Sequence, residues 1–137
     1  GQGMNCAFED CAELALLLEQ ESDWGQVFAE FERRRRPQTE AIAQMALENY
    51  VEMRDTVRDP VFQRRKLMSL QLEKRQPDRF IPRYSMVMFH ANIPYAEALR
   101  RGAVQAQILA EIDAARELSD ADLLRADGLI HARLAPV

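Results

Sequence analysis

Apolar residues recur at intervals of three and four positions along most of this chain, which is the spacing of residues on one face of an α-helix. Only five glycines and six prolines interrupt its 137 residues, of which 47% are apolar. A chain of this length can bury a single core without disulfides or metal ions. The pattern therefore predicts an all-α fold of about five to six helices.

Capping residues and prolines mark where the first helices begin and end. The first helix is expected to end near Gln20, and Ser22 or Asp23 can cap a second helix. The second helix should end before Pro37, because proline lacks a backbone N–H and disrupts a helix interior. A third helix should then follow over about 38–57.

The second half of the chain contains three further helices and one break. A fourth helix should begin at Pro60 and run to about Arg75. Three prolines then interrupt the pattern, so we expect an irregular or short extended segment near 77–94. A fifth helix should begin at Pro94, and the sequence SDAD at 119–122 is a capping-box variant that should open a sixth.

Five of the predicted helices have apolar residues that we expect to face the core. They are Phe8, Cys11, Ala12, Ala15, Leu16 and Leu18 in the first helix, Trp24, Val27, Phe28 and Phe31 in the second, Phe62, Leu67, Leu70 and Leu72 in the fourth, Leu99, Gly102, Ala106, Leu109 and Ile112 in the fifth, and Leu123, Ala126, Ile130 and Leu134 in the sixth. Gly102 is small enough to allow a close helix contact.

Charge and apolar run length exclude several functions. The net charge of -4 predicts no nucleic-acid partner, and the four arginines at 33–36 suit the negative end of a helix dipole. The longest apolar runs are too short to cross a bilayer, so no membrane partner is expected. Cys6 and Cys11 lie on different faces of a helix and cannot pair, which fits a reduced, cytoplasmic compartment. We expect both to be small buried residues, the alternative being a reactive Cys6 with a lowered pKa.

Candidate chemistry is sparse, and we assign no catalytic residue. His90 and His131 lack a carboxylate or cysteine at ligand spacing, so no metal site is expected. Gly1 and Gly3 precede a helix, an arrangement in which the backbone can approach a planar ligand and the helix amino end stabilises negative charge. An ordinary turn before a helix explains the same residues, and the pattern alone favours that explanation.

A second candidate site lies on the third predicted helix. Asn49, Glu52 and Met53 share one face, which can line a mainly apolar pocket and orient a polar ligand. The alternative is a solvated stripe beside packed methionines. Tyr84, in the predicted irregular segment, can donate a hydrogen bond into a pocket or serve as a core ring with a solvated hydroxyl.

Three segments occur in an order that is similar to that of a known family. They are GQGMNCAFEDC, MALENYVEMRD and RFIPRYSMVMFHANIPYAEALRRG, and the likeness extends from Gly1 to about Gly102. The chain resembles the carboxyl-terminal third of the bacterial kynurenine hydroxylases, a branch of the aromatic flavin hydroxylases. The first segment is shared by many flavin hydroxylases, whereas ENYVEMR with IPRYSMV is much more specific to this branch.

The resemblance implies that the chain is the helical carboxyl-terminal region of an α/β flavin monooxygenase. Residues 1–20 would end the FAD-binding domain, and 21–137 would form a helical substrate-capping domain. A Rossmann-type domain would bind FAD, NADPH would reduce it, and L-kynurenine would be hydroxylated at carbon 3. Gly3, Met4 and Asn5 match the backbone contacts that the family makes to the flavin ring.

The same resemblance implies a substrate site. Asn49 and Tyr84 match positions that bind the amino-acid end of kynurenine, with Glu52 and Met53 as neighbours in that pocket. The dinucleotide fingerprint is absent from this stretch, as are the arginine and tyrosine that hold the substrate carboxylate in the family. We therefore expect a missing amino-terminal flavin domain as partner, and a chain that alone binds no cofactor and is inactive.

A different class of function is a helical interaction module without catalysis, which would form a homodimer through exposed apolar faces. Without flavin, we expect Gly1 to Asn5 to be helical or disordered. The chain ends in a predicted helix rather than in the membrane-spanning tail of eukaryotic relatives, so we expect a bacterial, cytoplasmic protein.

Overall fold

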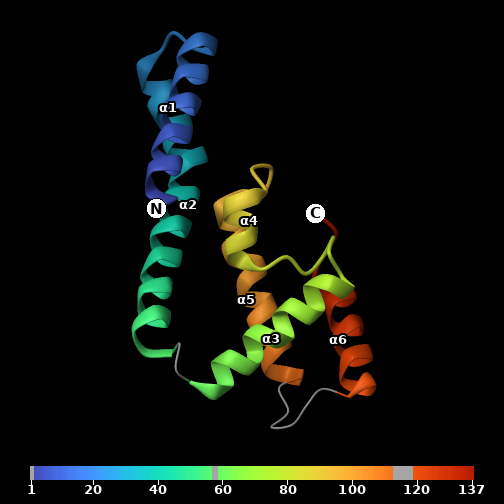
Figure 1. The fold of residues 1–137 in the computed structure, drawn as a ribbon. Helices are drawn as coiled ribbons and strands as arrows, with labels where there is room; N and C mark the ends of the chain where they lie inside the picture. Colours follow the sequence, from blue (N-terminus) through green and yellow to red (C-terminus); the bar gives the residue numbers. More distant parts are fainter. Residues whose placement is uncertain (1, 57–58, 113–118) are drawn as a thin grey trace.

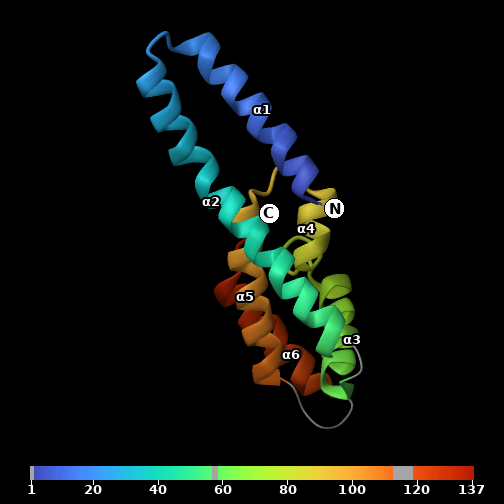
Figure 2. The same ribbon diagram turned by 90° about the vertical axis from the view of Figure 1, so that its left-hand side faces the viewer.

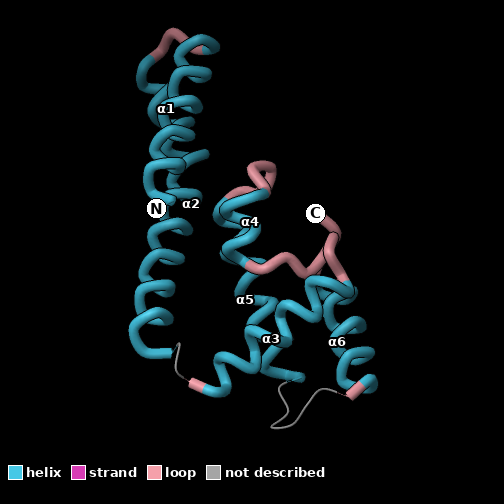
Figure 3. The backbone as a smooth tube through the Cα atoms, in the orientation of Figure 1, coloured by secondary structure: helices cyan, strands magenta, loops and turns pink. Residues whose placement is uncertain are grey.

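The computed structural model describes residues 2–56, 59–112 and 119–137, and helices dominate these three ranges (Figures 1 and 3). In chain order the elements are α1 (Gln2–Gln20), α2 (Trp24–Val51), the π-helical turn η1 (Glu52–Thr56), α3 (Pro60–Arg75), α4 (Arg83–Phe89), α5 (Tyr95–Ile112) and α6 (Asp120–Arg133). The residues that the structure describes contain helices, loops and turns but no strand, so the predicted all-α class is confirmed.

Helix α5 is the centre of the molecule. It packs against α2, α3, α4 and α6, whereas α1 lies antiparallel along α2 and forms a two-helix arm with it (Figures 1 and 2). Both views place the turn at 21–23, the far end of this arm, away from α3 and α6. Most of the contacts that join the arm to the rest of the molecule come from α2, and the first half of α1 adds contacts with Tyr95 of α5.

Three helix starts agree with the predicted ones, two of them with the predicted caps at Asp23 and Ser119. The Asp23 carboxylate accepts two backbone N–H groups of α2, at 2.7 and 3.2 Å. Asp59 accepts the N–H of Val61 in α3 at 2.9 Å. Ser119 and Asp122 form a reciprocal capping box at the start of α6. Each cap pairs N–H groups that a helix start leaves without an intrahelical partner, and the three predicted starts are confirmed.

Pro37 does not end a helix, which corrects the prediction of separate helices on its two sides. Helix α2 is continuous from Trp24 to Val51. Proline removes one backbone donor, so the hydrogen bond lost is the one to the carbonyl of Arg33. The four arginines before Pro37 do not cap a helix end but pair with carboxylates along the arm. The pairs are Arg33 with Glu30, Arg34 with Glu13 and Glu30, Arg35 with Glu9 and Asp10, and Arg36 with Glu32 and Glu40.

A short helix lies inside the segment that the prolines predicted to be irregular. Arg83–Phe89 forms α4, so the prediction for 77–94 is wrong at these positions, although loops and turns flank the helix on both sides. A helix of one or two turns is not stable through its own backbone bonds. Met86 is fully buried with Ile93 and with Ala98 of α5, and this packing stabilises α4.

The largest core cluster joins α3, α5 and α6. Its buried members are Met68, Leu72, Phe80, Ile108, Ile112, Ala126, Ile130 and Leu134. Five of the eight come from the predicted apolar stripes, namely Leu72, Ile112, Ala126, Ile130 and Leu134. The carboxyl-terminal half of the chain thus buries much of the face that its periodicity predicts.

The arm buries less of its apolar surface than the sequence predicts. Phe8, Trp24 and Phe28 are 66%, 60% and 53% exposed, whereas Leu17 and Val27 are buried. Each helix near the tip of the arm has one helical partner, so it buries a narrow strip and leaves the rest of its apolar face in water. Other predicted stripe residues that are exposed are Cys11, Ala12, Ala15, Leu16, Leu18, Leu67, Leu70 and Ala106.

Candidate functional site

Tyr84 connects the start of α4 to α2. Its hydroxyl donates to the backbone carbonyl of buried Met45 at 2.9 Å. Partial burial raises the pKa of the phenol, and the Glu52 carboxylate contributes to the rise. The phenol is therefore protonated at neutral pH and acts as a donor. Its partner is a backbone group of the protein, which neither sequence interpretation of Tyr84 had included.

Tyr84 and Glu52 line the same recess, whose volume is about 320 Å³. Phe62 of α3 and Leu109 of α5 provide apolar wall, and Lys66 brings a positive charge to it. A small cavity with apolar walls and a few polar groups suits a small amphipathic ligand. The structure thus brings together two of the residues that the sequence predicted as substrate contacts.

The other two predicted substrate residues lie outside the described lining of this recess. Asn49 is half-buried near the end of α2, and Met53 is 65% exposed in η1. Asn49 follows Met45 by four residues and therefore lies on the same side of α2. Because the Met45 carbonyl accepts the bond from Tyr84, the Tyr84 hydroxyl contacts α2 one turn before Asn49.

The predicted flavin contacts lie in the first turn of α1. The helix begins at Gln2, so Gly3, Met4 and Asn5 are helical, one of the two states expected without flavin. A Cβ atom on Gly3 would meet nothing within 4 Å, and Met4 is 67% exposed. The Asn5 side-chain amide donates to that of Gln2 at 3.0 Å. These residues do not belong to the described lining of the recess beside Tyr84.

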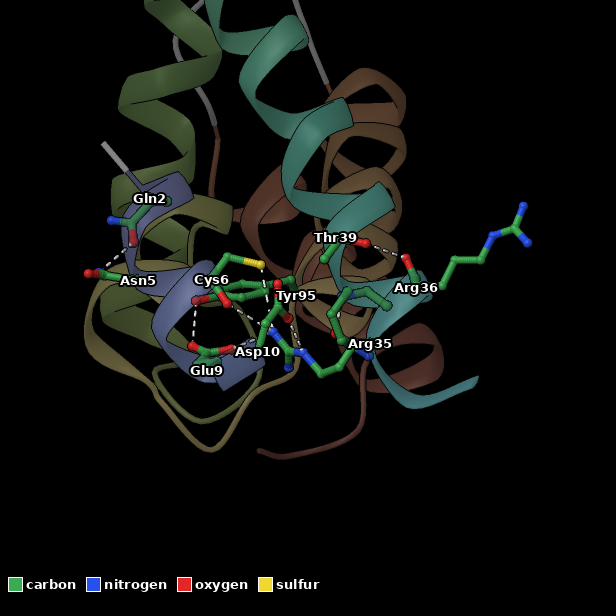
Figure 4. Close-up of polar contacts among 11 residues, drawn as sticks. Gln2, Asn5, Cys6, Glu9, Asp10, Arg35, Arg36, Thr39 and Tyr95 are labelled. Atoms are coloured by element: carbon green, nitrogen blue, oxygen red, sulfur yellow. Dashed lines mark hydrogen bonds and ion pairs between the residues drawn. The ribbon is translucent and has the colours of Figure 1, made fainter. Parts of the chain in front are cut away.

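A polar network that the sequence interpretation missed ties α1 to α2 and α5 (Figure 4). Arg35 of α2 donates to Asp10 at 2.5 Å and to Glu9 at 3.1 Å, and Tyr95 of α5 donates to Glu9 at 2.5 Å. Cys6 lies beside this network, and its burial, with the nearby Asp10 carboxylate, raises the pKa of the thiol. The interpretation of Cys6 as a buried residue is confirmed, and the alternative of a reactive thiol with a lowered pKa is wrong.

Two further properties concern only the ranges that the structure describes. No three histidine, cysteine or acidic side chains in these ranges lie close enough together to hold a metal ion. Likewise, none of the helices described combines the length and apolarity that crossing a bilayer requires.

Comparison with known proteins defines the class of this chain. No protein-family model matches it. Proteins from Stenotrophomonas maltophilia (strain K279a) and Xanthomonas euvesicatoria pv. vesicatoria (strain 85-10) are 47% and 48% identical to it, over 98% and 100% of the chain. A protein from Xanthomonas campestris pv. campestris (strain B100) is also 48% identical over 100% of the chain. Over its whole length the chain is thus homologous to part of a monooxygenase, a class of oxidoreductase.

These relatives carry one name. All three are named kynurenine 3-monooxygenase, so the chain is a homologue of a segment of these enzymes, and the resemblance seen in the sequence is confirmed. The chain spans 30% of the length of each of these relatives.

Proposed function

We propose that this chain is the carboxyl-terminal helical part of an FAD-dependent enzyme that uses NADPH and hydroxylates L-kynurenine at carbon 3. The identity of 47–48% to proteins named kynurenine 3-monooxygenase, across nearly all of this chain, supports the proposal. Residues 1–20 would end the flavin domain, and 21–137 would cap the substrate. The partner would be an amino-terminal flavin domain, without which the chain is inactive.

The substrate site would lie where α2, η1 and α4 meet. Tyr84, whose phenol is protonated, and the Asn49 amide would bind the amino-acid end of kynurenine. Glu52 lines the recess beside Tyr84, and exposed Met53 follows it in the chain. Lys66 on the same recess would attract the substrate carboxylate. These side chains orient the substrate and exclude water, which is the part of the catalysis that a capping domain supplies.

Gly3, Met4 and Asn5 are proposed to contact the flavin ring. They fit a planar group, because the space around Gly3 is open and Met4 and Asn5 are exposed. The first turn of a helix also leaves backbone N–H groups without intrahelical partners. FAD, when bound, supplies the redox and oxygen chemistry. The three residues would hold the ring and stabilise negative charge on it through the amino end of α1.

Purification of the full-length protein that carries this chain tests the proposal. It should be yellow, should consume NADPH faster when L-kynurenine is added, and should yield a product heavier than kynurenine by one oxygen atom in mass spectrometry. Asn49→Ala should weaken kynurenine binding by about tenfold, because a polar contact to the substrate is lost. A colourless full-length protein, or NADPH consumption that ignores kynurenine, would refute the assignment.

A second candidate function is a homodimerisation module without catalysis. The exposed apolar side chains of the arm favour it, since Phe8, Trp24 and Phe28 are all more than half exposed. The rings of Trp24 and Phe28 lie 5.7 Å apart and form one apolar patch. Light scattering on the isolated chain measures its oligomeric state directly. A monomer at every concentration would contradict the dimer.

A further inference from the structure

Helix α4 depends on its neighbours for its position. It has seven residues, and its N-cap, Pro82, makes no side-chain hydrogen bond to the first turn. A helix this short is not stable alone, so contacts with other elements determine its orientation. Its first two residues, Arg83 and Tyr84, both make polar contacts with α2. Whatever holds Arg83 therefore also affects where the phenol of Tyr84 lies.

Arg83 is held on α2 by an ion pair. Its guanidinium donates to the carboxylate of Glu48, whose other oxygen accepts from Gln44 at 2.9 Å. Although partial burial alone would raise the pKa of Glu48, the bonds from Gln44 and Arg83 keep it below the ordinary value. The Arg83 side chain is 20% exposed and that of Glu48 is 40% exposed, so water screens this part-buried pair somewhat less than a pair on the open surface.

The same guanidinium lies over the ring of Tyr84. Its central carbon is 5.3 Å from the ring centroid, within the range of a cation–π contact. Tyr84 in turn donates to Met45, which precedes Glu48 by three residues on α2. Arg83 and Tyr84 thus contact one turn of α2 at Glu48 and Met45, respectively. Asn49 directly follows Glu48 in the chain.

Gly102 of α5 makes room for Arg83. A Cβ atom at Gly102 would lie 2.7 Å from Cδ of Arg83, closer than Cβ atoms pack, and 3.1 Å from its Cγ, which is tighter than most such contacts. The clash would involve the inner carbons of the arginine, which cannot swing away without moving the guanidinium. The absence of a Cβ at Gly102 therefore leaves the space on α5 that the Arg83 side chain occupies when it pairs with Glu48.

From this geometry we propose that Gly102, Arg83 and Glu48, together called the Arg83 brace, position Tyr84 against the Asn49 turn of α2 for substrate binding. Arg83 and Gly102 also line the recess beside Tyr84, but the role proposed for all three is that of positioning residues, which act through Tyr84 and Asn49. The inference rests on the proposed function, in which Tyr84 and Asn49 bind the amino-acid end of kynurenine.

The test uses the full-length protein and measures kynurenine affinity by flavin absorbance titration, together with KM and kcat. Arg83→Met, Glu48→Gln and Gly102→Ala should each weaken kynurenine binding by about fivefold or more, because a misplaced contact loses affinity steeply. KM should rise with kcat at saturating kynurenine changed less than about twofold, the signature of lost binding contacts. Combining Arg83→Met with Glu48→Gln should add little to either single change, because both break the same pair.

Matched variants separate the brace from general effects on folding. Arg83→Lys keeps the charge and should recover most of the affinity that Arg83→Met loses, whereas a role in packing alone would make the two equal. Arg100→Met removes an exposed arginine that pairs with Glu97 on its own helix, and should bind kynurenine normally. Gly128→Ala places a Cβ in open space in α6 and should also be neutral for binding.

The outcomes distinguish the brace from the function it rests on. If wild type binds kynurenine and Tyr84→Phe weakens binding, while Arg83→Met and Glu48→Gln bind normally, the brace is wrong and the proposed function stands. If wild type does not bind kynurenine, the proposed function fails and the brace fails with it. Additive losses from Arg83→Met and Glu48→Gln would also overturn the brace, because they would show that the two residues act independently.

Discussion

Arg101 brings a charged side chain into the interior of the protein, where its exposed fraction is 3%. Its terminal nitrogen donates to the carbonyls of Arg79 at 2.7 Å and Ala135 at 2.9 Å, which joins α5 to the loop before α4 and to the chain after α6. Burial lowers the pKa of the guanidinium, so these bonds only partly offset the loss of water. The residue therefore supports the structure mainly by joining two segments of the chain through their backbone carbonyls.

Arg101→Ala should lower the free energy of unfolding by about 2–4 kcal/mol, because it leaves two carbonyls unpaired and opens a cavity. Urea unfolding followed by circular dichroism measures this. Arg100→Ala is the matched control, since Arg100 is exposed and its loss should cost less than about 0.5 kcal/mol. Equal midpoints for the two variants would show that the Arg101 contacts add nothing to stability.

Some residues of the candidate site could be identified from the sequence, and others could not. Tyr84 and Glu52 could be predicted because each lies in a short segment with a family likeness, and the structure places both on one recess. Arg83 could not, since its contacts depend on Glu48, 35 positions earlier, and on a glycine in another helix. Contacts between distant parts of the chain leave no periodic signal in the sequence around either partner.

At the scale of helices, Pro37 is the clearest exception to the rule that proline is disfavoured inside a helix. It lies inside α2, and the carbonyl of Arg33 has no N–H at position 37 to accept. Pro37→Ala restores that donor and should raise the free energy of unfolding by about 1–3 kcal/mol. Thermal unfolding measures the change. A loss of stability would instead mean that the arm needs the fixed backbone angle or the packing that proline provides.

Helix boundaries with a cap could be predicted, and those set by packing could not. Asp23 and Ser119 act through neighbours a few residues away, so the sequence alone identified both caps. Asp59 caps α3 in the same way, although the sequence predicted only the start at Pro60. The continuity of α2 through Pro37 could not be predicted, and the ion pairs around Pro37 and the packing of α1 along α2 are contacts that the proline rule does not include. Helix α4 forms because Met86 is buried by other elements. The apolar faces of the arm were overestimated for the same reason, as periodicity shows a face but not whether a partner covers it.

At the scale of the whole molecule, paired carboxylates join separate elements and make stability depend on pH. Glu48 pairs with Arg83, and Asp127 of α6 pairs with Arg75 of α3. The hydrogen bond from Arg75 lowers the pKa of Asp127, and the bonds from Gln44 and Arg83 keep that of Glu48 below its ordinary value. A carboxyl whose pKa is lower in the folded state stabilises the fold above its unfolded pKa, and this stability is lost as the pH falls through the folded value.

The melting temperature should therefore stay nearly constant from neutral pH down to about pH 5.5, and should fall below about pH 4.5, near the ordinary pKa of a carboxyl group. Differential scanning calorimetry across this range tests it. The double variant Glu48→Gln with Asp127→Asn should be less stable at neutral pH and should lose less on acidification. A fall of the same size in the variant would mean that other carboxylates carry the acid sensitivity.

Oxidation of the six methionines can show which surfaces of the molecule are covered by another domain, a ligand or a second copy of the chain. Met4, Met53 and Met88 are 67%, 65% and 56% exposed, whereas Met45, Met68 and Met86 are buried. Mild peroxide converts accessible methionine to the sulfoxide, which peptide mass spectrometry counts at each position. In the isolated chain the exposed three should react first, with the buried three as internal controls.

In the full-length protein Met4 should be protected, because the proposed flavin domain would cover the first turn of α1. Met53 should become protected when kynurenine is added, if it lies at the substrate site. Equal oxidation of Met4 in the isolated chain and in the full-length protein would contradict the covering domain. Protection of Met4 in the isolated chain that grows with protein concentration would instead favour the homodimer, because only self-association depends on concentration in this way.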